Sequence, residues 1–355
     1  MSTAVRFLVL ALTSRCNLAC RYCYLAATRQ GMDMDEAVLA EALALADHGE
    51  PCLVQITGGE PTLVPEKIEQ VLRRARSMRM RPRLAIQTNA TLLTPELVRL
   101  FQDHHVRIGV SLDGPPEIQD RLRGRADATL RGLVLLEEMG VDFRVTTVVT
   151  GENVLVLDRL ALLLAGFATC RGLGLDLLVV RGRGRTGDPQ PATPSGLQEG
   201  VTALAGTLAR INRCRNRPIR LRELDLLTMA GKGRPFCHAA TGHSLAVHPD
   251  GRLFPCGQTM GWQALAMGTV WKPAKAKSLL TTVQLTGRQC SACALENRCP
   301  GDCPGRLRVN DEPHLACALY RALAPFTPQH ERLPGDETDL TPGIFMTTPS
   351  AMLRR

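Results

Sequence analysis

Ten of the thirteen cysteines fall into two arrays whose short spacings favour metal ligation over disulfides. The first array is Cys16, Cys20 and Cys23. The second array contains seven residues near the end of the chain: Cys237, Cys256, Cys290, Cys293, Cys299, Cys303 and Cys317. Thiolates at such intervals bind zinc or iron-sulfur clusters. Because three thiolates occupy only three corners of a [4Fe-4S] cube, the first array predicts a cluster with one iron open for chemistry.

The composition predicts a large globular protein of the cytoplasm. With 355 residues, of which 45% are hydrophobic, the chain can bury a sizeable core and is expected to form two domains. The apolar run Phe7–Leu12 is too short to span a membrane, and it is followed by Arg15 instead of a small-residue cleavage site. We therefore expect no membrane segment and no export signal, and the closely spaced cysteines favour a reducing compartment.

The charge of the chain predicts an acidic partner that is not a nucleic acid. The formal net charge is +9 with neutral thiols. Two three-thiolate clusters and one four-thiolate cluster would lower it to about +5. Only three Tyr, two Trp and eight Phe are present, so stacking platforms for bases are scarce. A basic rim that attracts an acidic peptide or an organic anion is the better use of this charge.

Apolar runs alternate with helical patterns along the first 215 residues or so, which predicts a parallel sheet. The expected strands are Arg6–Leu12, Cys52–Thr57, Arg83–Thr88, Val106–Leu112, Phe143–Val149 and Leu173–Val180. The expected helices are Asp35–His48, Pro65–Met78, Pro95–Asp103, Thr129–Gly140, Val154–Ala168 and Gly196–Arg213, and Thr94 before Pro95 reads as a helix cap. Six such units favour an α/β fold with a partial (β/α)6 TIM-like barrel, and an open doubly wound sheet is the alternative.

Polar motifs follow the first four expected strands. Cys16–Cys23 follows the first, Gly58–Pro61 the second, Gln87–Asn89 the third and Ser111–Gly114 the fourth. The working face of a parallel β/α barrel lies at the carboxyl ends of its strands. The four motifs are therefore expected to face one cavity.

The motifs at the first two strand ends resemble a known superfamily. The run from Cys16 to Cys23 is similar to the three-cysteine signature of radical S-adenosylmethionine (SAM) enzymes, and Gly58–Pro61, with Gly59 and Glu60, resembles their methionine-binding motif. The resemblance implies a [4Fe-4S] cluster whose fourth iron is chelated by SAM. Glycines would let the backbone approach the cofactor closely.

The resemblance extends to further SAM contacts. It implies that Ser111 and Arg123 contact the carboxylate and ribose of SAM, and that Gln87 and Asn89 lie near the ribose. Arg123 suits a carboxylate because a guanidinium forms a planar fork of donors. The backbone of Tyr22 would lie near the adenine, and its ring is either part of that contact or simply packed.

The second array resembles the seven-cysteine SPASM domain found in a subgroup of radical SAM enzymes. The resemblance implies two auxiliary [4Fe-4S] clusters, three clusters in all. Cys237, Cys256 and Cys303 would hold the proximal cluster, whose remaining position is left to substrate, water, His238 or Cys214. The distal cluster would be held by Cys290, Cys293, Cys299 and Cys317. A structural zinc ribbon is the alternative for this array. The expected domains are a barrel over 1–235, a SPASM domain over 236–325 and a polar tail over 326–355, loosely packed or disordered.

These features predict an enzyme that cleaves SAM to a 5′-deoxyadenosyl radical and abstracts hydrogen from its substrate. By resemblance, the substrate is a peptide or protein that is crosslinked or dehydrogenated. A separate leader-binding protein and an electron donor such as flavodoxin or ferredoxin are expected partners. Gly257 stands where sulfatase-maturing relatives carry a catalytic Asp, which disfavours that reaction, and no catalytic acid or base is assigned.

Other interpretations remain open at this stage. Oxidation of tetrapyrrole side chains is a second enzymatic possibility. A non-catalytic electron carrier is the alternative of another class, although it needs neither an open iron nor the Gly58–Pro61 motif. Arg181–Arg185 follows the sixth expected strand and either binds an acidic group or forms a solvated loop.

Overall fold

The chain folds into a curved α/β barrel that is open on one side. The structure, a computed structural model, describes residues 4–229, 236–274, 279–282, 290–310 and 314–329, and the strands at 337–341 and 344–348. The first six strands are β1 (Phe7–Ala11), β2 (Leu53–Thr57), β3 (Arg83–Thr88), β4 (Arg107–Ser111), β5 (Phe143–Val149) and β6 (Cys170–Leu177). The helices that accompany them are α1 (Glu36–Ala44), α2 (Pro65–Arg76), α3 (Pro95–Asp103), α4 (Pro116–Leu122), α5 (Ala126–Glu138), α6 (Leu157–Ala165) and α7 (Pro194–Arg213).

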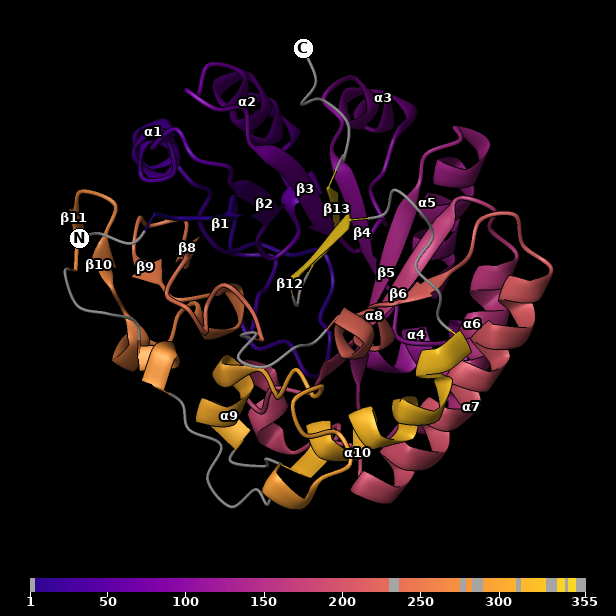
Figure 1. Cartoon of the computed structure of the whole chain (residues 1–355). Helices are drawn as coiled ribbons and strands as arrows, with labels where there is room; N and C mark the ends of the chain where they lie inside the picture. The colour runs from indigo at the N-terminus through magenta and orange to yellow at the C-terminus, as the bar shows by residue number, and fades with distance from the viewer. Residues whose placement is uncertain are drawn as a thin grey trace, which may run out of the picture.

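The sheet has the strand order β7-β6-β5-β4-β3-β2-β1-β8-β9. The added strands are β7 (Arg220–Leu221), β8 (Ser244–Val247) and β9 (Leu253–Phe254). All neighbours from β7 to β8 pair in parallel, and only β9 is antiparallel. Figure 1 shows the strands side by side with the helices around the outside. The predicted partial parallel barrel is confirmed, and the open doubly wound sheet is not formed.

Strand β1 shows why the expected strands read as continuous apolar runs. Leu8 and Leu10 point into the main core with the covering helices, while Phe7, Val9 and Ala11 belong to a second apolar cluster with Phe254 and Met260. All five residues of β1 are buried. Both faces of the strand are therefore covered, as in other parallel sheets.

The helix starts follow local capping chemistry. The Thr94 side chain accepts a hydrogen bond from the Leu97 N–H at the start of α3, and Pro95 occupies the first turn, as predicted. Asp35 caps α1 in the same way by accepting from the Val38 N–H. These caps fix where the chain turns back from each strand-end loop into its helix.

Strand β6 and helix α4 differ from the expectation. Strand β6 begins at Cys170 and ends at Leu177, three residues earlier than expected, because Phe143 on β5 pairs with Cys170. Helix α4 was not expected, and it lies between the Ser111 and Arg123 positions. It starts directly after Pro115, where Pro116 takes the first helical position.

The C-terminal region is built partly onto the barrel. After α8 (Arg222–Met229), strand β8 pairs with β1, so this region shares the barrel's sheet. Further elements are β10 (Gly268–Thr269), β11 (Lys272–Pro273), α9 (Pro304–Asn310) and α10 (His314–Leu323), and α10 packs against α7. Within the expected polar tail, β12 (Glu337–Thr341) and β13 (Ile344–Thr348) form an antiparallel pair. Residues 342–343 and 349–355 lie outside the described part.

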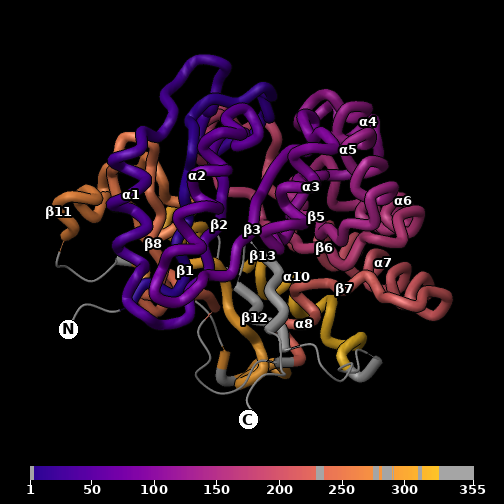
Figure 2. The backbone as a smooth tube through the Cα atoms, turned by 90° about the horizontal axis from the view of Figure 1, so that it is seen from above, coloured from indigo at the N-terminus to yellow at the C-terminus, as the bar shows by residue number. Residues whose placement is uncertain are grey.

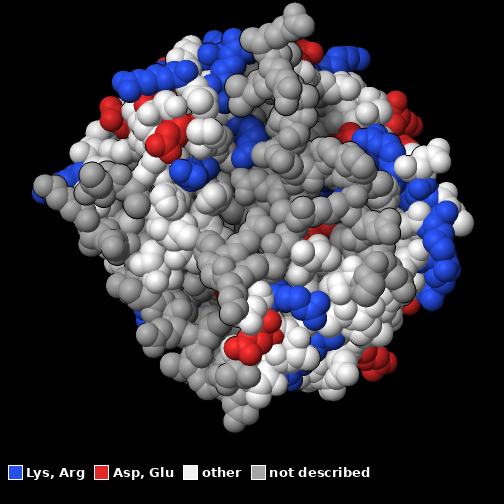
Figure 3. All heavy atoms as spheres, in the orientation of Figure 1, with Lys and Arg blue, Asp and Glu red and all other residues white. Residues whose placement is uncertain are grey.

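The two ends of the barrel differ. The long loop between β1 and α1 rises at one end, where the carboxyl ends of the strands lie (Figure 2). On the face seen in Figure 3, the described Lys and Arg residues are interspersed with Asp and Glu.

No helix in the described ranges is long and apolar enough to cross a membrane.

Candidate active site

The first cysteine array lies in the loop that follows β1. Cys16 and Cys20 are buried and Cys23 is half-buried. The loop folds back on itself, since the Cys16 N–H donates to the Thr28 carbonyl at 2.7 Å and the Cys23 N–H donates to the Cys20 carbonyl at 3.2 Å. The pKa of Cys16 is raised to about 12, chiefly by burial, and the neighbouring Cys20 and Cys23 contribute to the rise. The three sulfurs are therefore close enough to interact electrostatically.

The glycines of the Gly58–Pro61 motif hold this loop against β2. The Gly59 N–H donates to the Thr13 carbonyl at 2.8 Å, and the Glu60 N–H donates to the Arg15 carbonyl at 2.9 Å. A Cβ at Gly58 would lie 2.4 Å from the Thr13 oxygen, and a Cβ at Gly59 would lie 2.1 Å from the Arg15 oxygen. Only glycine fits at such a close approach. These glycines thus serve the junction between two strand-end loops.

Glu60 extends the junction to the loop after β3. Its carboxylate accepts hydrogen bonds from the Thr62 N–H at 3.1 Å, the Thr88 hydroxyl at 2.6 Å and the Asn89 N–H at 2.7 Å. Burial raises the pKa of this carboxyl, while the hydrogen bonds oppose the rise. The Asn89 amide donates to Asn17 at 2.9 Å. Glu60 and Asn89 therefore order the loops around the cysteines.

A second polar network surrounds Tyr22. The Tyr22 hydroxyl donates to Asp113 Oδ2, and Arg123 Nη1 donates to the Tyr22 oxygen at 2.5 Å. The Tyr22 ring is thus packed and hydrogen bonded, and Tyr22 also lines the cavity that holds the cysteines. The Arg123 Nε is buried and finds no partner among the described residues. Arg123 lines the same cavity as the cysteines, so this donor fits an anionic ligand.

Gln87 and Ser111 complete the predicted strand-end set. Gln87 Nε2 donates to the Ser111 hydroxyl at 2.9 Å. The Gln87 Oε1 is buried and accepts no hydrogen bond from the described residues. Both residues line the cavity together with Gly58, Gly59 and Glu60, whereas Pro61 does not appear in its wall.

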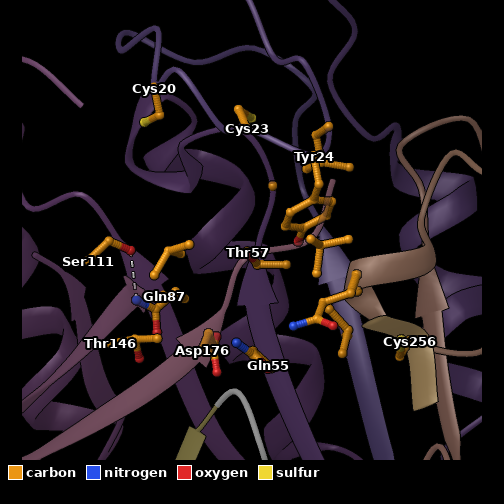
Figure 4. Close-up of a pocket in the computed structure, with 18 of the residues that line it drawn as sticks. Cys20, Cys23, Tyr24, Gln55, Thr57, Gln87, Ser111, Thr146, Asp176 and Cys256 are labelled. Atoms are coloured by element: carbon orange, nitrogen blue, oxygen red, sulfur yellow. Dashed lines mark hydrogen bonds between the residues drawn. The ribbon is translucent and has the colours of Figure 1, made fainter. Parts of the chain in front are cut away.

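Cysteines of both arrays line one cavity of about 250 Å³. Figure 4 shows its strand side chains below the first cysteine loop, with Cys256 to one side. The six cysteines in its wall are Cys16, Cys20, Cys23, Cys237, Cys256 and Cys303. Burial raises the pKa of Cys303, and so do the nearby Cys256 and Cys237. The two trios, distant in sequence, therefore face one space.

The other four cysteines of the second array lie outside this cavity: Cys290, Cys293, Cys299 and Cys317. Within the described ranges, no three His, Cys, Asp or Glu side chains are arranged to hold a single metal ion. Among the remaining candidates, His238 lines the cavity, while Cys214 is exposed at the end of α7. Cys52 and Cys170 are buried in the main core.

The cavity residues missed by the sequence analysis include polar side chains on three strands. Gln55 on β2, Thr146 on β5 and Asp176 on β6 point into the cavity (Figure 4). The Asp176 side chain is 21% exposed and accepts a hydrogen bond from Arg222 at 2.8 Å. The available sequence signal was a polar residue within an apolar strand, because a buried polar side chain needs a hydrogen-bond partner or a solvated cavity.

A second cavity, of about 650 Å³, lies at the opposite ends of β4 to β6. Its wall includes Arg107, Arg144, Arg171, Arg217 and Arg220 but none of the cysteines. The two cysteine trios thus gather at the end of the barrel where barrel enzymes place their active sites.

Comparison with known proteins identifies a known domain in the first half of the chain. Residues 10–163 match the family model of the radical SAM superfamily. The chain is 28% identical over 369 residues to the serine-type anaerobic sulfatase-maturating enzyme of Klebsiella aerogenes, covering 90% of this chain and 85% of that protein. It is 31% identical over 196 residues to the AdoMet-dependent heme synthase of Oleidesulfovibrio alaskensis, covering 51% of this chain and 48% of that protein.

The fold is also that of a solved structure, native anSMEcpe with bound AdoMet and Kp18Cys peptide. The TM-score is 0.73 at 19% identity, with 91% of this chain and 97% of that chain covered. The family model spans β1 to α6, including the first cysteine array and the Gly58–Pro61 motif. Residues 10–163 therefore form a radical SAM domain, and the chain is a radical SAM enzyme.

Proposed function

We propose that this radical SAM enzyme oxidatively modifies a side chain of a peptide or protein. The observation that carries the proposal is the shared cavity, whose wall contains both the first cysteine trio and the trio Cys237, Cys256 and Cys303. A radical formed at the first site and an electron acceptor at the second would then face the same substrate. Such proximity suits a reaction that removes both hydrogen and an electron.

The residues of the first site fit a [4Fe-4S] cluster and SAM. Cys16, Cys20 and Cys23 would ligate three irons. When bound, the cluster and SAM supply a 5′-deoxyadenosyl radical. Arg123 would bind the SAM carboxylate through its unsatisfied Nε, and Gln87 would accept from a SAM hydroxyl through its unsatisfied Oε1. The packed loops of Glu60 and Tyr22 would keep water away from the radical.

The second array fits two auxiliary [4Fe-4S] clusters. Cys237, Cys256 and Cys303 would ligate the one that borders the cavity, and the outer four cysteines would ligate the other. Gln258 already contacts this trio, since its Oε1 lies 2.9 Å from the Cys303 sulfur. Because Cys290 is exposed, the outer cluster would be within reach of an electron donor such as flavodoxin or ferredoxin.

The substrate class rests on the relatives. One of them is named as a sulfatase-maturating enzyme, and one solved relative holds a peptide. Gly257 lacks the carboxylate expected of sulfatase maturation, so we assign proton acceptance to Asp176, whose carboxylate lines the cavity beside the buried Arg222. A tetrapyrrole substrate is the second candidate, supported by the likeness to a heme synthase over about half of the chain.

The experiment is anaerobic reconstitution followed by metal and product analysis. Three clusters predict about twelve irons and twelve sulfides per chain. Replacing Cys16, Cys20 and Cys23 by Ala should remove about four irons and all 5′-deoxyadenosine formation. Persistence of that product would contradict the assignment, and an electron carrier would form none in the wild type. A total near four irons, or zinc in the C-terminal region, would refute the auxiliary clusters.

A further inference from the structure

The segment from Leu178 to Arg185, which follows β6, contacts three of the four segments that bring cysteines to the cavity. It contains the short helical turn η3 (Gly182–Thr186). The sequence analysis predicted that the loop Arg181–Arg185 either binds an acidic group or is solvated. In the structure its first two arginines instead make defined contacts inside the protein, on opposite sides of the loop.

Arg183 holds the first cysteine loop. Its Nε donates to the Cys20 carbonyl and its Nη1 to the Ala27 carbonyl, both at 2.8 Å. The Arg183 N–H donates to the Cys23 carbonyl at 3.0 Å. Gly182 has a φ of +55°, and a Cβ there would lie 2.3 Å from the same Cys23 oxygen. The arginine-glycine loop is therefore pressed against the backbone between Cys20 and Ala27.

Arg181 reaches the other trio. Its Nη1 donates to the Gln258 carbonyl at 2.9 Å, two residues after Cys256, and its guanidinium lies 5.5 Å from the Trp262 ring centre. The Oε1 of the same Gln258 accepts a hydrogen bond from the Cys303 thiol at 2.9 Å. Arg181 thus places a half-buried cation beside this trio.

The third contact is made through α9, which begins directly after Cys303. Asn310 at its end accepts a hydrogen bond from the Val180 N–H at 2.9 Å and donates to the Leu178 carbonyl at 2.7 Å. The segment between β6 and Arg183 is therefore fastened to both cysteine arrays. In contrast, Arg185 in the same loop is exposed.

We propose that Arg181 and Arg183 are positioning residues that couple the two cysteine arrays. Arg183 fixes the loop of Cys20 and Cys23, and Arg181 raises the reduction potential of the centre held by Cys237, Cys256 and Cys303. This inference rests on the cluster assignment of the proposed function. A nearby cation favours the reduced cluster, which carries one more negative charge, and burial weakens the screening by salt.

The test compares Arg181→Gln, Arg181→Lys and Arg183→Gln with Arg185→Gln as the matched control, all in the reconstituted full-length protein. Arg181→Gln should lower the potential of an auxiliary cluster, followed by electron paramagnetic resonance during reductive titration, at unchanged iron content. Arg181→Lys should keep the wild-type potential, because it keeps the charge. Arg183→Gln should lower the iron content by up to about four per chain and lower the melting temperature. Arg185→Gln should match the wild type in all three measurements.

Two outcomes separate this inference from the function on which it rests. Wild-type protein with about twelve irons, in which Arg181→Gln and Arg183→Gln behave like Arg185→Gln, would overturn the coupling role alone. Wild-type protein with about four irons would overturn the auxiliary clusters and the role of Arg181 with them. A potential that falls equally in Arg181→Gln and Arg181→Lys would show that packing, and not charge, sets it.

Discussion

Gly59→Ala tests the junction between the Gly58–Pro61 motif and the first cysteine loop. The added Cβ would lie 2.1 Å from the Arg15 carbonyl oxygen and 3.1 Å from the Cys16 Cβ. The nearer atom belongs to the backbone and cannot rotate away. The two loops must separate by about 1 Å to reach the distances that real Cβ atoms show.

This separation would have a measurable cost. Overpacking contributes about 1–3 kcal/mol, and weakening the hydrogen bonds of the Gly59 and Glu60 N–H groups adds roughly 0.5–1.5 kcal/mol each. A loss of about 4 kcal/mol in the free energy of unfolding corresponds, for 355 residues, to a melting temperature lower by about 5 °C. Because Cys16 moves with the loop, 5′-deoxyadenosine formation should fall as well.

The assay is thermal unfolding of the reconstituted protein, with iron content measured in parallel. Gly206→Ala on α7 is the control, since the nearest atom to its added Cβ is the end of the Arg210 side chain at 3.9 Å. A glycine inside a helix is expected to gain about 0.5–1 kcal/mol from this change. The reasoning would be refuted if Gly59→Ala had the same melting temperature as Gly206→Ala and kept its full iron content.

Three further predictions concern the cysteines and the cavity. In iron-free protein at neutral pH, iodoacetamide should modify Cys293 faster than Cys16, as measured by mass spectrometry. A backbone hydrogen bond from Leu295 lowers the pKa of Cys293, whereas burial raises the pKa of Cys16 to about 12. A larger fraction of Cys293 is therefore present as the reactive thiolate. Equal rates would contradict this difference. Cys214→Ser, at an exposed position, should leave the iron content unchanged, while Cys256→Ser should lower it; a loss in Cys214→Ser would make Cys214 a ligand. Asp176→Asn should spare 5′-deoxyadenosine formation but reduce product about 10²-fold or more once a substrate is known, and an unchanged product yield would exclude Asp176 as the proton acceptor.

The sequence by itself determined the family, the parallel barrel and the end of the barrel that carries the chemistry. Short metal-ligand spacings are local properties, and a buried parallel strand is recorded as a continuous apolar run, as β1 shows. Those features are readable without any long-range contact. The capped start of α3 at Thr94 is readable for the same reason.

Only the tertiary structure decided which contacts the residues of these motifs make. Gly59 and Glu60 were predicted as SAM contacts, and the fold shows in addition that they bind the first cysteine loop to the loops after β2 and β3. The roles of Asp176 and Arg181 depend on partners 46 and 77 residues away, Arg222 and Gln258. The local sequence does not predict such a partner, because the tertiary fold decides which distant residues a strand or loop side chain contacts. The meeting of two cysteine trios in one cavity has the same origin.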